Sequence, residues 1–140
     1  MTEPPLLDTH AWVWWVNGER RLGGRILEAL NALPPEERPY LSDISLWEAA
    51  TAVELGRLRL EMSLEAWLGA AAHPATVRVL PVTPEIAVEV ARLPRTFHRD
   101  PADRLIVATS RVLGLPLLTR DRVIVRSRLV RRWSGDQARH

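Results

Sequence analysis

The sequence predicts an α/β fold, with a central parallel sheet and helices on its faces, in a single domain that spans residues 1–140. Three observations support this prediction. Short apolar segments alternate along the chain with stretches of helical spacing, as in folds built on a parallel sheet. A hydrophobic fraction of 46% in 140 residues is enough for one core of ordinary size. The chain contains no internal repeat, and its proline-rich stretch at 34–39 is too short for a domain linker.

The first predicted strand is Pro5–Leu7, which ends at Asp8 and is followed by a helix with the sequence THAWVWWV. Asp8 directly precedes this helix, so it also fits the role of its N-cap. A second, amphipathic helix is predicted over Gly23–Leu33. The tryptophans of the first helix are expected in the core or at an interface rather than as a stacking platform for bases. They are Trp12, Trp14 and Trp15.

The second predicted strand is Tyr40–Ser42, and a helix follows it over residues 44–55. Glu48 falls on the inward face of this helix, where a carboxylate is costly unless it is paired or bound to a metal. The alternative is a capping box, in which the Glu48 side chain reaches back to the Ser45 amide. The other residues predicted on this inward face are Ile44, Thr51 and Leu55.

The second half of the chain continues the alternation of helices and strands. The predicted elements are a helix over Ser63–Ala72, a strand over Val77–Val82, a helix from Thr83 to Pro94, a helix that begins in HRDPADRL and ends at Gly114, and a strand over Leu115–Thr119. The region Val123–Val130 mixes valine and isoleucine with arginine, and it is expected to hold a last short helix and an edge strand.

Two aspartates mark the start of the HRDPADRL helix. Asp100 fits the N-cap, Pro101 fits the first helical position, and Asp103 falls in the first turn, where negative charge is favoured. Helix capping alone therefore accounts for both acids. A functional role for Asp103 requires other acids that meet it in space.

Three such acids lie where strands end or helices begin. Asp8 and Asp121 directly follow predicted strands, although Asp121 also fits a turn, and Glu48 lies in the early turns of a helix after a strand. Ligands of parallel sheets bind outside the carboxyl ends of the strands. We therefore expect Asp8, Glu48, Asp103 and Asp121 to share one edge of the sheet.

Converging carboxylates repel one another, and a hard divalent cation offsets that repulsion. Oxygen ligands, with no cysteine and no paired histidines, indicate Mg²⁺ or Mn²⁺. Such an ion binds phosphate oxygens and lowers the pKa of a bound water. The expected reaction is metal-assisted hydrolysis of a phosphodiester, with a metal-bound water as the attacking group because no side chain is well suited to be the nucleophile.

Composition restricts the possible functions further. All 19 Lys or Arg positions are arginine. The absence of lysine excludes a P-loop nucleotide site and Schiff-base chemistry, since both need a lysine. Residues 1–91 carry a net charge of −6 and residues 92–140 a net charge of +8, from 7 Arg with 13 acids and 12 Arg with 4 acids. The basic charge of residues 92–140 suits a polyanionic substrate. The alternative is that these arginines form a solvated surface that binds nothing specific. This alternative applies above all to Arg126, Arg128, Arg131 and Arg132.

The chain has no cysteine, no basic segment before an apolar one at its N-terminus, and no membrane span. These features predict a cytoplasmic protein that does not interact with a membrane.

Taken in order, the segments LLDTHAWVW, SLWEAA, HRDPADRLIVATS and LLTRD resemble the PIN domain, and most closely the VapC-type ribonuclease toxins of prokaryotic toxin–antitoxin pairs. The resemblance extends from Leu6 to about Asp121, and the ordered set of four motifs is more specific than any one of them. It implies a PIN-like α/β/α sandwich around a parallel sheet and an endoribonuclease that depends on Mg²⁺ or Mn²⁺. It also implies a homodimer and a cognate VapB-like antitoxin that occupies the active-site groove.

The resemblance assigns the family's four acids to Asp8, Glu48, Asp103 and Asp121. It implies that Asp8 and Asp103 hold the metal directly, while Glu48 and Asp121 complete the acidic pocket through water or a second ion. Asp100 is an additional acid of the DPxDR subset, and its role as cap or ligand stays open.

Three other functions are alternatives to a metal-dependent ribonuclease. A haloacid-dehalogenase-like phosphatase needs a second aspartate two residues after the strand-end Asp8, and His10 stands there instead. A non-catalytic nucleic-acid or partner-binding module would keep the fold without the metal. A DNA-directed nuclease stays open, because nothing in the sequence reports on the 2′-hydroxyl of the substrate.

Overall fold

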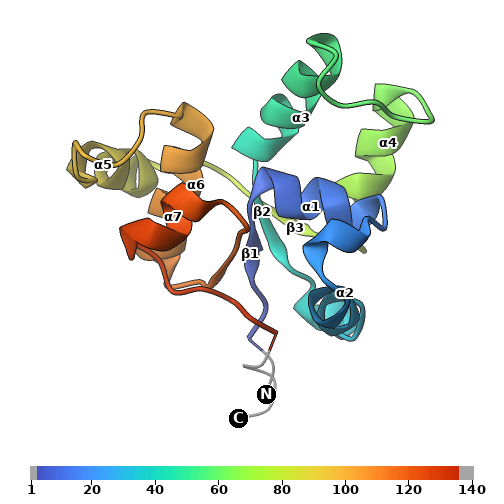
Figure 1. The fold of residues 1–140 in the computed structure, drawn as a ribbon, viewed down its shortest axis with the longest axis horizontal. Coiled ribbons are helices and arrows are strands. Elements are labelled where there is room, and N and C mark those ends of the chain that lie inside the picture. The colour runs from blue at the N-terminus through green and yellow to red at the C-terminus, as the bar shows by residue number, and fades with distance from the viewer. Residues whose placement is uncertain (1–2, 136–140) are drawn as a thin grey trace.

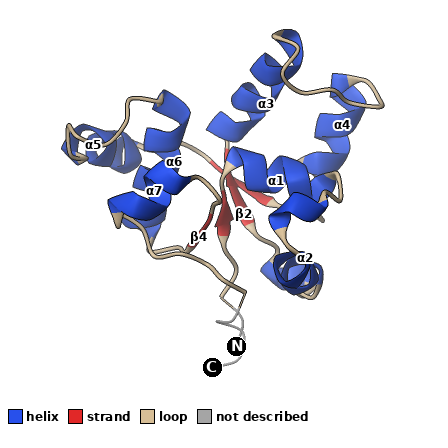
Figure 2. Ribbon diagram, in the orientation of Figure 1, coloured by secondary structure: helices blue, strands red, loops and turns tan. Residues whose placement is uncertain are grey.

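The computed structural model of the chain describes residues 3–135. A parallel four-stranded sheet lies at its centre, with the strand order β3-β2-β1-β4. In Figure 2 the strands form the middle layer between two groups of helices. The strands are short: β1 Leu6–Leu7, β2 Tyr40–Ser42, β3 Arg78–Leu80 and β4 Leu117–Leu118.

The helices cover both faces of the sheet, so the predicted α/β/α sandwich is confirmed. α1, α2 and α4 lie on one side of the strands, and α5, α6 and α7 lie on the other (Figure 1). Their bounds are α1 Thr9–Val16, α2 Gly24–Asn31, α3 Ile44–Glu54, α4 Leu64–Ala71, α5 Pro84–Arg92, α6 Pro101–Leu113 and α7 Arg122–Ser127. Two 3₁₀ turns, η1 Arg20–Leu22 and η2 Pro35–Glu37, lie on either side of α2.

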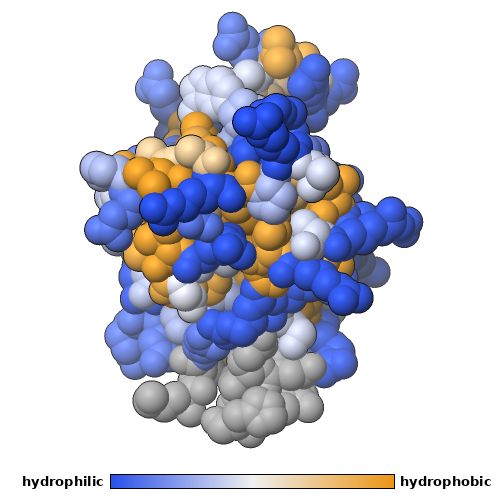
Figure 3. All heavy atoms as spheres, turned by 90° about the vertical axis from the view of Figure 1, so that its left-hand side faces the viewer, coloured by the Kyte–Doolittle hydropathy of each residue, from blue (hydrophilic) through white to orange (hydrophobic). Residues whose placement is uncertain are grey.

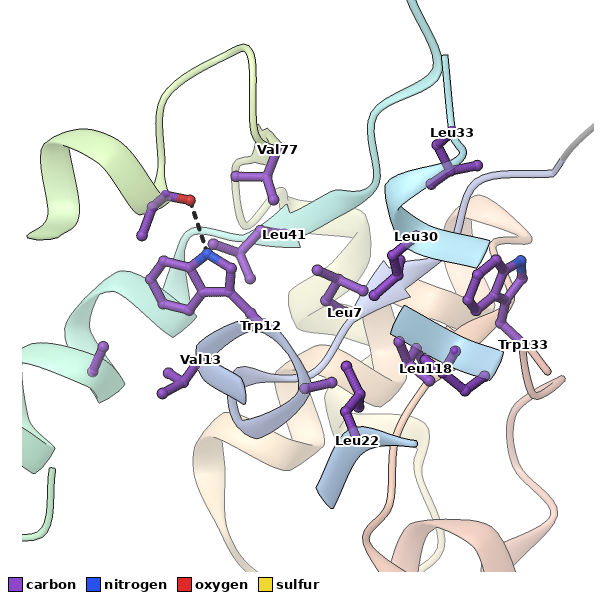
Figure 4. Close-up of a cluster of buried hydrophobic side chains, with 14 of the residues drawn as sticks. Leu7, Trp12, Val13, Leu22, Leu30, Leu33, Leu41, Val77, Leu118 and Trp133 are labelled. Carbon is purple, nitrogen blue, oxygen red and sulfur yellow. Dashed lines mark hydrogen bonds between the residues drawn. The ribbon is translucent and has the colours of Figure 1, made fainter. Parts of the chain in front are cut away.

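Each two-residue strand contributes to two hydrophobic cores, because successive side chains on a strand point to opposite faces. Leu7 of β1 and Leu118 of β4 pack with α1, α2 and α4, in the cluster shown in Figure 4. Leu6 and Leu117 pack with α6 and α7 on the other face. The sheet therefore needs only these short strands to hold the two helical layers together.

Trp12 occupies the centre of the larger core and joins α1 to α4. It has no exposed surface, its ring lies 5.0 Å from that of Trp67, and its Nε1 donates to the carbonyl of Ala71 at 2.9 Å (Figure 4). This confirms the prediction of a core role for this tryptophan. Trp14 and Trp15 are only half-buried.

The segment after α7 returns to the sheet beside β4. The amide of Trp133 donates to the carbonyl of Leu117, and its buried indole donates to the carbonyl of Glu3, both at 2.9 Å. The predicted edge strand is not formed, since a single parallel bridge joins Leu117 to Arg132. In the two-residue strand β4, only Leu117 pairs with this segment, donating to the Arg131 carbonyl at 2.8 Å and accepting from the Trp133 amide.

Two further predictions need correction. Leu55 is 57% exposed rather than inward-facing, because it follows the last residue of α3, whose buried residues are Ser45 and Ala49. The strand predicted over Val77–Val82 is shorter, at Arg78–Leu80. Within residues 3–135, none of the helices is both long and apolar enough to cross a membrane.

Candidate active site

Asp8 lies directly after β1, at the carboxyl edge of the sheet. Its side chain caps α1 by accepting a hydrogen bond from the Ala11 amide at 2.7 Å, and it is only 4% exposed. Burial raises the pKa of Asp8, and hydrogen bonds from the Thr119 side chain and the Ala11 amide oppose that rise. Asp8 is thus both a helix cap and a buried carboxyl group, and a nearby cation would stabilise its ionised form.

Asp121 follows β4 and is connected to Asp8 through a threonine. The Asp121 amide donates to the Thr119 hydroxyl at 3.0 Å, and that buried hydroxyl in turn hydrogen-bonds Asp8. The Asp121 carboxylate caps α7 by accepting from the amides of Val123 and Ile124, at 2.8 and 3.2 Å. Thr119 therefore fixes the relative positions of two of the predicted site acids.

Asp103 lies in the first turn of α6, and its side chain is 19% exposed. Its amide donates to the side chain of Asp100, which is the N-cap of the helix. Burial, followed by the negative charges of four other carboxylates, raises the pKa of Asp103 to about 7. Those carboxylates, in decreasing order of effect, are Asp100, Asp121, Glu48 and Asp8. The acids from four separate elements therefore act on one another at a single edge of the sheet.

Glu48 lies on α3 near this edge, and its side chain does not reach back to the Ser45 amide as the alternative interpretation required. The capping box given as the alternative is absent, because the N-cap of α3 is Asp43 and Ser45 lies within the helix. The Ser45 hydroxyl bonds instead to the Thr9 hydroxyl at 2.8 Å, and both are buried. This contact ties the start of α3 to the start of α1, and it sets where Glu48 lies relative to Asp8.

A groove with a volume of about 410 Å³ opens between α1 and α3 beside the acids. Glu48 and Asp100 are among the residues that line it, together with apolar side chains that include Val13, Ala52 and Leu58. Two tryptophans also line it, Trp14 under the guanidinium of Arg21 at 4.5 Å and Trp47, which is 59% exposed. The groove thus presents an open apolar surface directly next to a cluster of negative charge.

His98 was missed as a site residue in the sequence, and the structure places it against Asp103. The Nε2 atom of its imidazole lies 3.2 Å from Oδ2 of Asp103. A histidine just before the helix that carries the acid is the feature of the sequence that could have identified it.

The arginines of the basic half are partly committed to structural contacts. Arg104 donates to the carbonyls of Val90, Phe97 and His98, so it holds the loop between α5 and α6 in place. Arg131, one of the arginines interpreted as either steering or solvated, instead donates to Glu3 and to the Gly114 carbonyl. Net charge alone therefore overstates the number of guanidinium groups available to a polyanion.

The donor set fits a hard divalent cation. Buried and half-buried carboxylates whose pKa values are raised by burial or mutual repulsion are stabilised by an added positive charge. Among residues 3–135, no three His, Asp or Glu side chains already lie close enough together to enclose an ion. A divalent cation that keeps several of its waters needs only one or two of these carboxylates as direct ligands.

Comparisons with known proteins agree with the fold described above. Among solved structures, DNA-bound VapBC from Salmonella typhimurium has a TM-score of 0.71 at 18% identity, covering 96% of this chain and 99% of that one. A toxin–antitoxin complex from Klebsiella pneumoniae has a TM-score of 0.64 at 21% identity, covering 94% and 97%. At these identities, the structures establish a shared fold.

The sequence comparisons go further. Ribonuclease VapC22 from Mycobacterium tuberculosis (strain ATCC 25618 / H37Rv) is 36% identical over 117 residues, which are 84% of this chain and 86% of the relative. A family model described as PIN domain matches residues 6–128, a span that includes all four predicted site acids. The chain therefore belongs to the PIN domain family, as the order of its acidic motifs predicted.

Proposed function

We propose that this protein is a VapC-type endoribonuclease that hydrolyses RNA phosphodiesters with Mg²⁺ or Mn²⁺ held by Asp8, Glu48, Asp103 and Asp121. The observation that carries this proposal is the position of Asp103, whose pKa is raised to about 7 by burial and by the other acids at the same edge of the sheet. A residue that only stabilises the start of a helix does not need other carboxylates nearby. The 36% identity to a protein named as a ribonuclease supports RNA as the substrate.

The four acids form two pairs in this proposal. Asp8 and Asp103 would hold the metal directly, while Glu48 and Asp121 would complete the pocket through water or a second ion. Thr119 orients Asp8 by hydrogen bonding to its carboxylate. The bound metal supplies an activated water and positive charge against the phosphate. Burial of Asp8 and Asp103 keeps the carboxylates in fixed positions and limits their hydration.

The direct test is cleavage of RNA by the purified protein. With Mg²⁺ or Mn²⁺, we expect cleavage within single-stranded or loop regions of total bacterial RNA, and we expect EDTA to abolish it until metal is restored. A DNA strand of the same sequence as a cleaved RNA segment separates a ribonuclease from a DNA-directed nuclease. Cleavage that persists in EDTA would contradict the metal assignment. Folded protein that cleaves nothing with either metal would favour a non-catalytic binding module.

We further propose that a VapB-like antitoxin restrains this enzyme in the cytoplasm. The groove between α1 and α3 supports this proposal, because a partner seated on its apolar surface also reaches the acids at Glu48 and Asp100. An arginine of such a partner would pair well with that acidic end. The solved structures that share the fold include a toxin–antitoxin complex and DNA-bound VapBC, which agrees with a protein partner.

Growth of a bacterial host provides the test of restraint. Expression of this chain alone is expected to arrest growth, and co-expression of the adjacent antitoxin gene is expected to restore it. The Asp103→Asn variant is the matched control, since it should fold and be harmless. If the unaltered protein accumulates in folded form without slowing growth, the toxin assignment is wrong.

A homodimer is part of the same proposal. The face formed by α5, α6 and α7, which is turned toward the viewer in Figure 3, carries hydrophobic areas between its charged side chains. Val88, Leu113 and Val123 of these helices are each about half exposed. Apolar surface of this kind supports an interface with a second copy.

A further inference from the structure

The site contains an imidazole that the proposed roles do not yet use. His98 lies in the loop between α5 and α6, and its side chain is 30% exposed. Its Nε2 atom is buried and lies 3.2 Å from Oδ2 of Asp103. Within residues 3–135, this atom has no acceptor in full hydrogen-bond geometry, so a buried N–H at this position is incompletely satisfied. The Asp103 carboxylate, at 3.2 Å, is within donor–acceptor distance of this atom.

The surroundings of His98 hold it in this position. The edge of its ring meets the buried ring of Phe97 at a centroid distance of 4.8 Å and an interplanar angle of 79°. The carbonyl groups of Phe97 and His98 both accept from Nη1 of Arg104 at 3.3 Å. Arg104 also donates to the Val90 carbonyl of α5 at 3.2 Å. Packing and hydrogen bonds from two helices thus fix the imidazole against the acid.

The acid that His98 approaches is the one most affected by its neighbours. The negative charges of four other carboxylates act on Asp103, and a freely rotating side chain there could turn either oxygen toward them. A donor on Oδ2 removes this freedom and leaves Oδ1 for an ion. In metal sites of proteins, hydrogen bonds to the ligand from an outer shell fix its orientation, and their loss typically costs about 10–100-fold in metal affinity or activity.

We propose that His98 is a positioning residue, whose imidazole donates from Nε2 to Oδ2 of Asp103 and thereby leaves Oδ1 of that carboxylate for the divalent cation. The proposal rests on the proposed function for the presence of the cation. It assigns to His98 a role that acts through Asp103 rather than on the substrate.

Binding of Mn²⁺ alone, measured as the metal concentration that raises the melting temperature half-maximally, tests this role without any RNA. His98→Leu removes the donor and should weaken Mn²⁺ binding about 10–100-fold. His98→Gln should recover most of the affinity, because its amide nitrogen can take the place of Nε2. In the Asp103→Asn background, His98→Leu should have no further effect. His73→Leu, at an exposed histidine after α4, is the matched control.

The outcomes are distinguishable. Unchanged Mn²⁺ affinity in His98→Leu, or equal losses in His98→Leu and His98→Gln, would overturn the positioning role alone. No Mn²⁺ binding by the unaltered protein would overturn both this role and the metal assignment. If His98→Leu does not fold, His98→Asn replaces it, since its shorter amide reaches only the Nδ1 position. We then expect His98→Gln to bind Mn²⁺ more tightly than His98→Asn, and the opposite order would contradict the proposal.

Discussion

Asp103→Asn is expected to remove nearly all RNA cleavage while leaving the fold intact. The amide keeps the shape of the carboxylate but lacks the charge that offsets the dehydration of Mg²⁺. Changes in residues that merely orient a ligand cost about 10–100-fold, so loss of a direct ligand should reduce the rate by more than about 100-fold. The measurement is the initial rate of RNA cleavage at saturating Mn²⁺, together with the melting temperature with and without the metal.

The same substitution should change how stability depends on pH. The pKa of Asp103 is raised from 3.8 to about 7 in the folded protein, so between these values the folded state keeps a proton that the unfolded chain has released. Without metal, the stability of the unaltered protein should therefore fall as the pH rises through this range. Asp103→Asn cannot ionise, so this part of the pH dependence should disappear and the variant should melt higher than the unaltered protein near pH 8.

Asp100→Asn is the matched control for the cleavage experiment; it is not one for the pH experiment, because the Asp100 charge itself helps to raise the pKa of Asp103. Asparagine caps helices about as well as aspartate, so the variant should keep its fold, and it should keep its activity if Asp100 acts mainly as the N-cap that the structure shows. If Asp103→Asn melts much lower than the unaltered protein yet retains metal-dependent cleavage, Asp103 is a structural residue and the central assignment fails.

Trp12→Ala is expected to cause the largest loss of stability, about 3–5 kcal/mol, as for other buried tryptophans cut back to alanine. Its ring fills the centre of the core between α1 and α4, and its indole satisfies the carbonyl of Ala71 near the end of α4. The site should suffer too, because Trp12 shares a helix with Thr9, which hydrogen-bonds Ser45. Urea unfolding followed by circular dichroism gives the free energy of unfolding.

Trp47→Ala provides the comparison for that experiment. Trp47 is 59% exposed, so its loss should change the free energy of unfolding by only about 0.5 kcal/mol. Equal losses in the two variants would show that Trp12 does not hold the helical layers together. A large loss in Trp12→Ala alone would agree with the packing described.

The sequence predicted the parts of the site whose cause is local. Asp8 and Asp100 lie directly before helices, so their capping roles can be read from neighbouring residues. The places of Asp8 and Asp121 after strands can be read in the same way, whereas the cap that Asp121 provides to α7 was expected only as a turn. The alternation of strands and helices then predicted the parallel sheet, since such connections leave the carboxyl ends of the strands on one side.

The rest depended on contacts between distant segments. The alternative interpretation of Ser45 and Glu48 as a capping box fails because Asp43 is the N-cap of α3 and Ser45 bonds Thr9, which is 36 residues away in the chain. Helical spacing predicted that Leu55 faces inward, but spacing alone does not show whether another element lies beside that position, and Leu55 is exposed. The orientation of His98 depends on Arg104 and Phe97, and neither contact follows from a metal-ligand spacing in the sequence.

During synthesis on the ribosome, β1 emerges long before the strand beside which it finally lies. Leu6 pairs with Leu117, so the centre of the sheet stays incomplete until nearly the whole described chain has been made. Asp8 likewise gains its hydrogen bond from Thr119 only at that stage. A nascent chain therefore carries its acids on separate, unassembled segments. If the folded protein cleaves RNA, this order of assembly keeps the chain inactive while it is still attached to the ribosome, which is itself built largely of RNA.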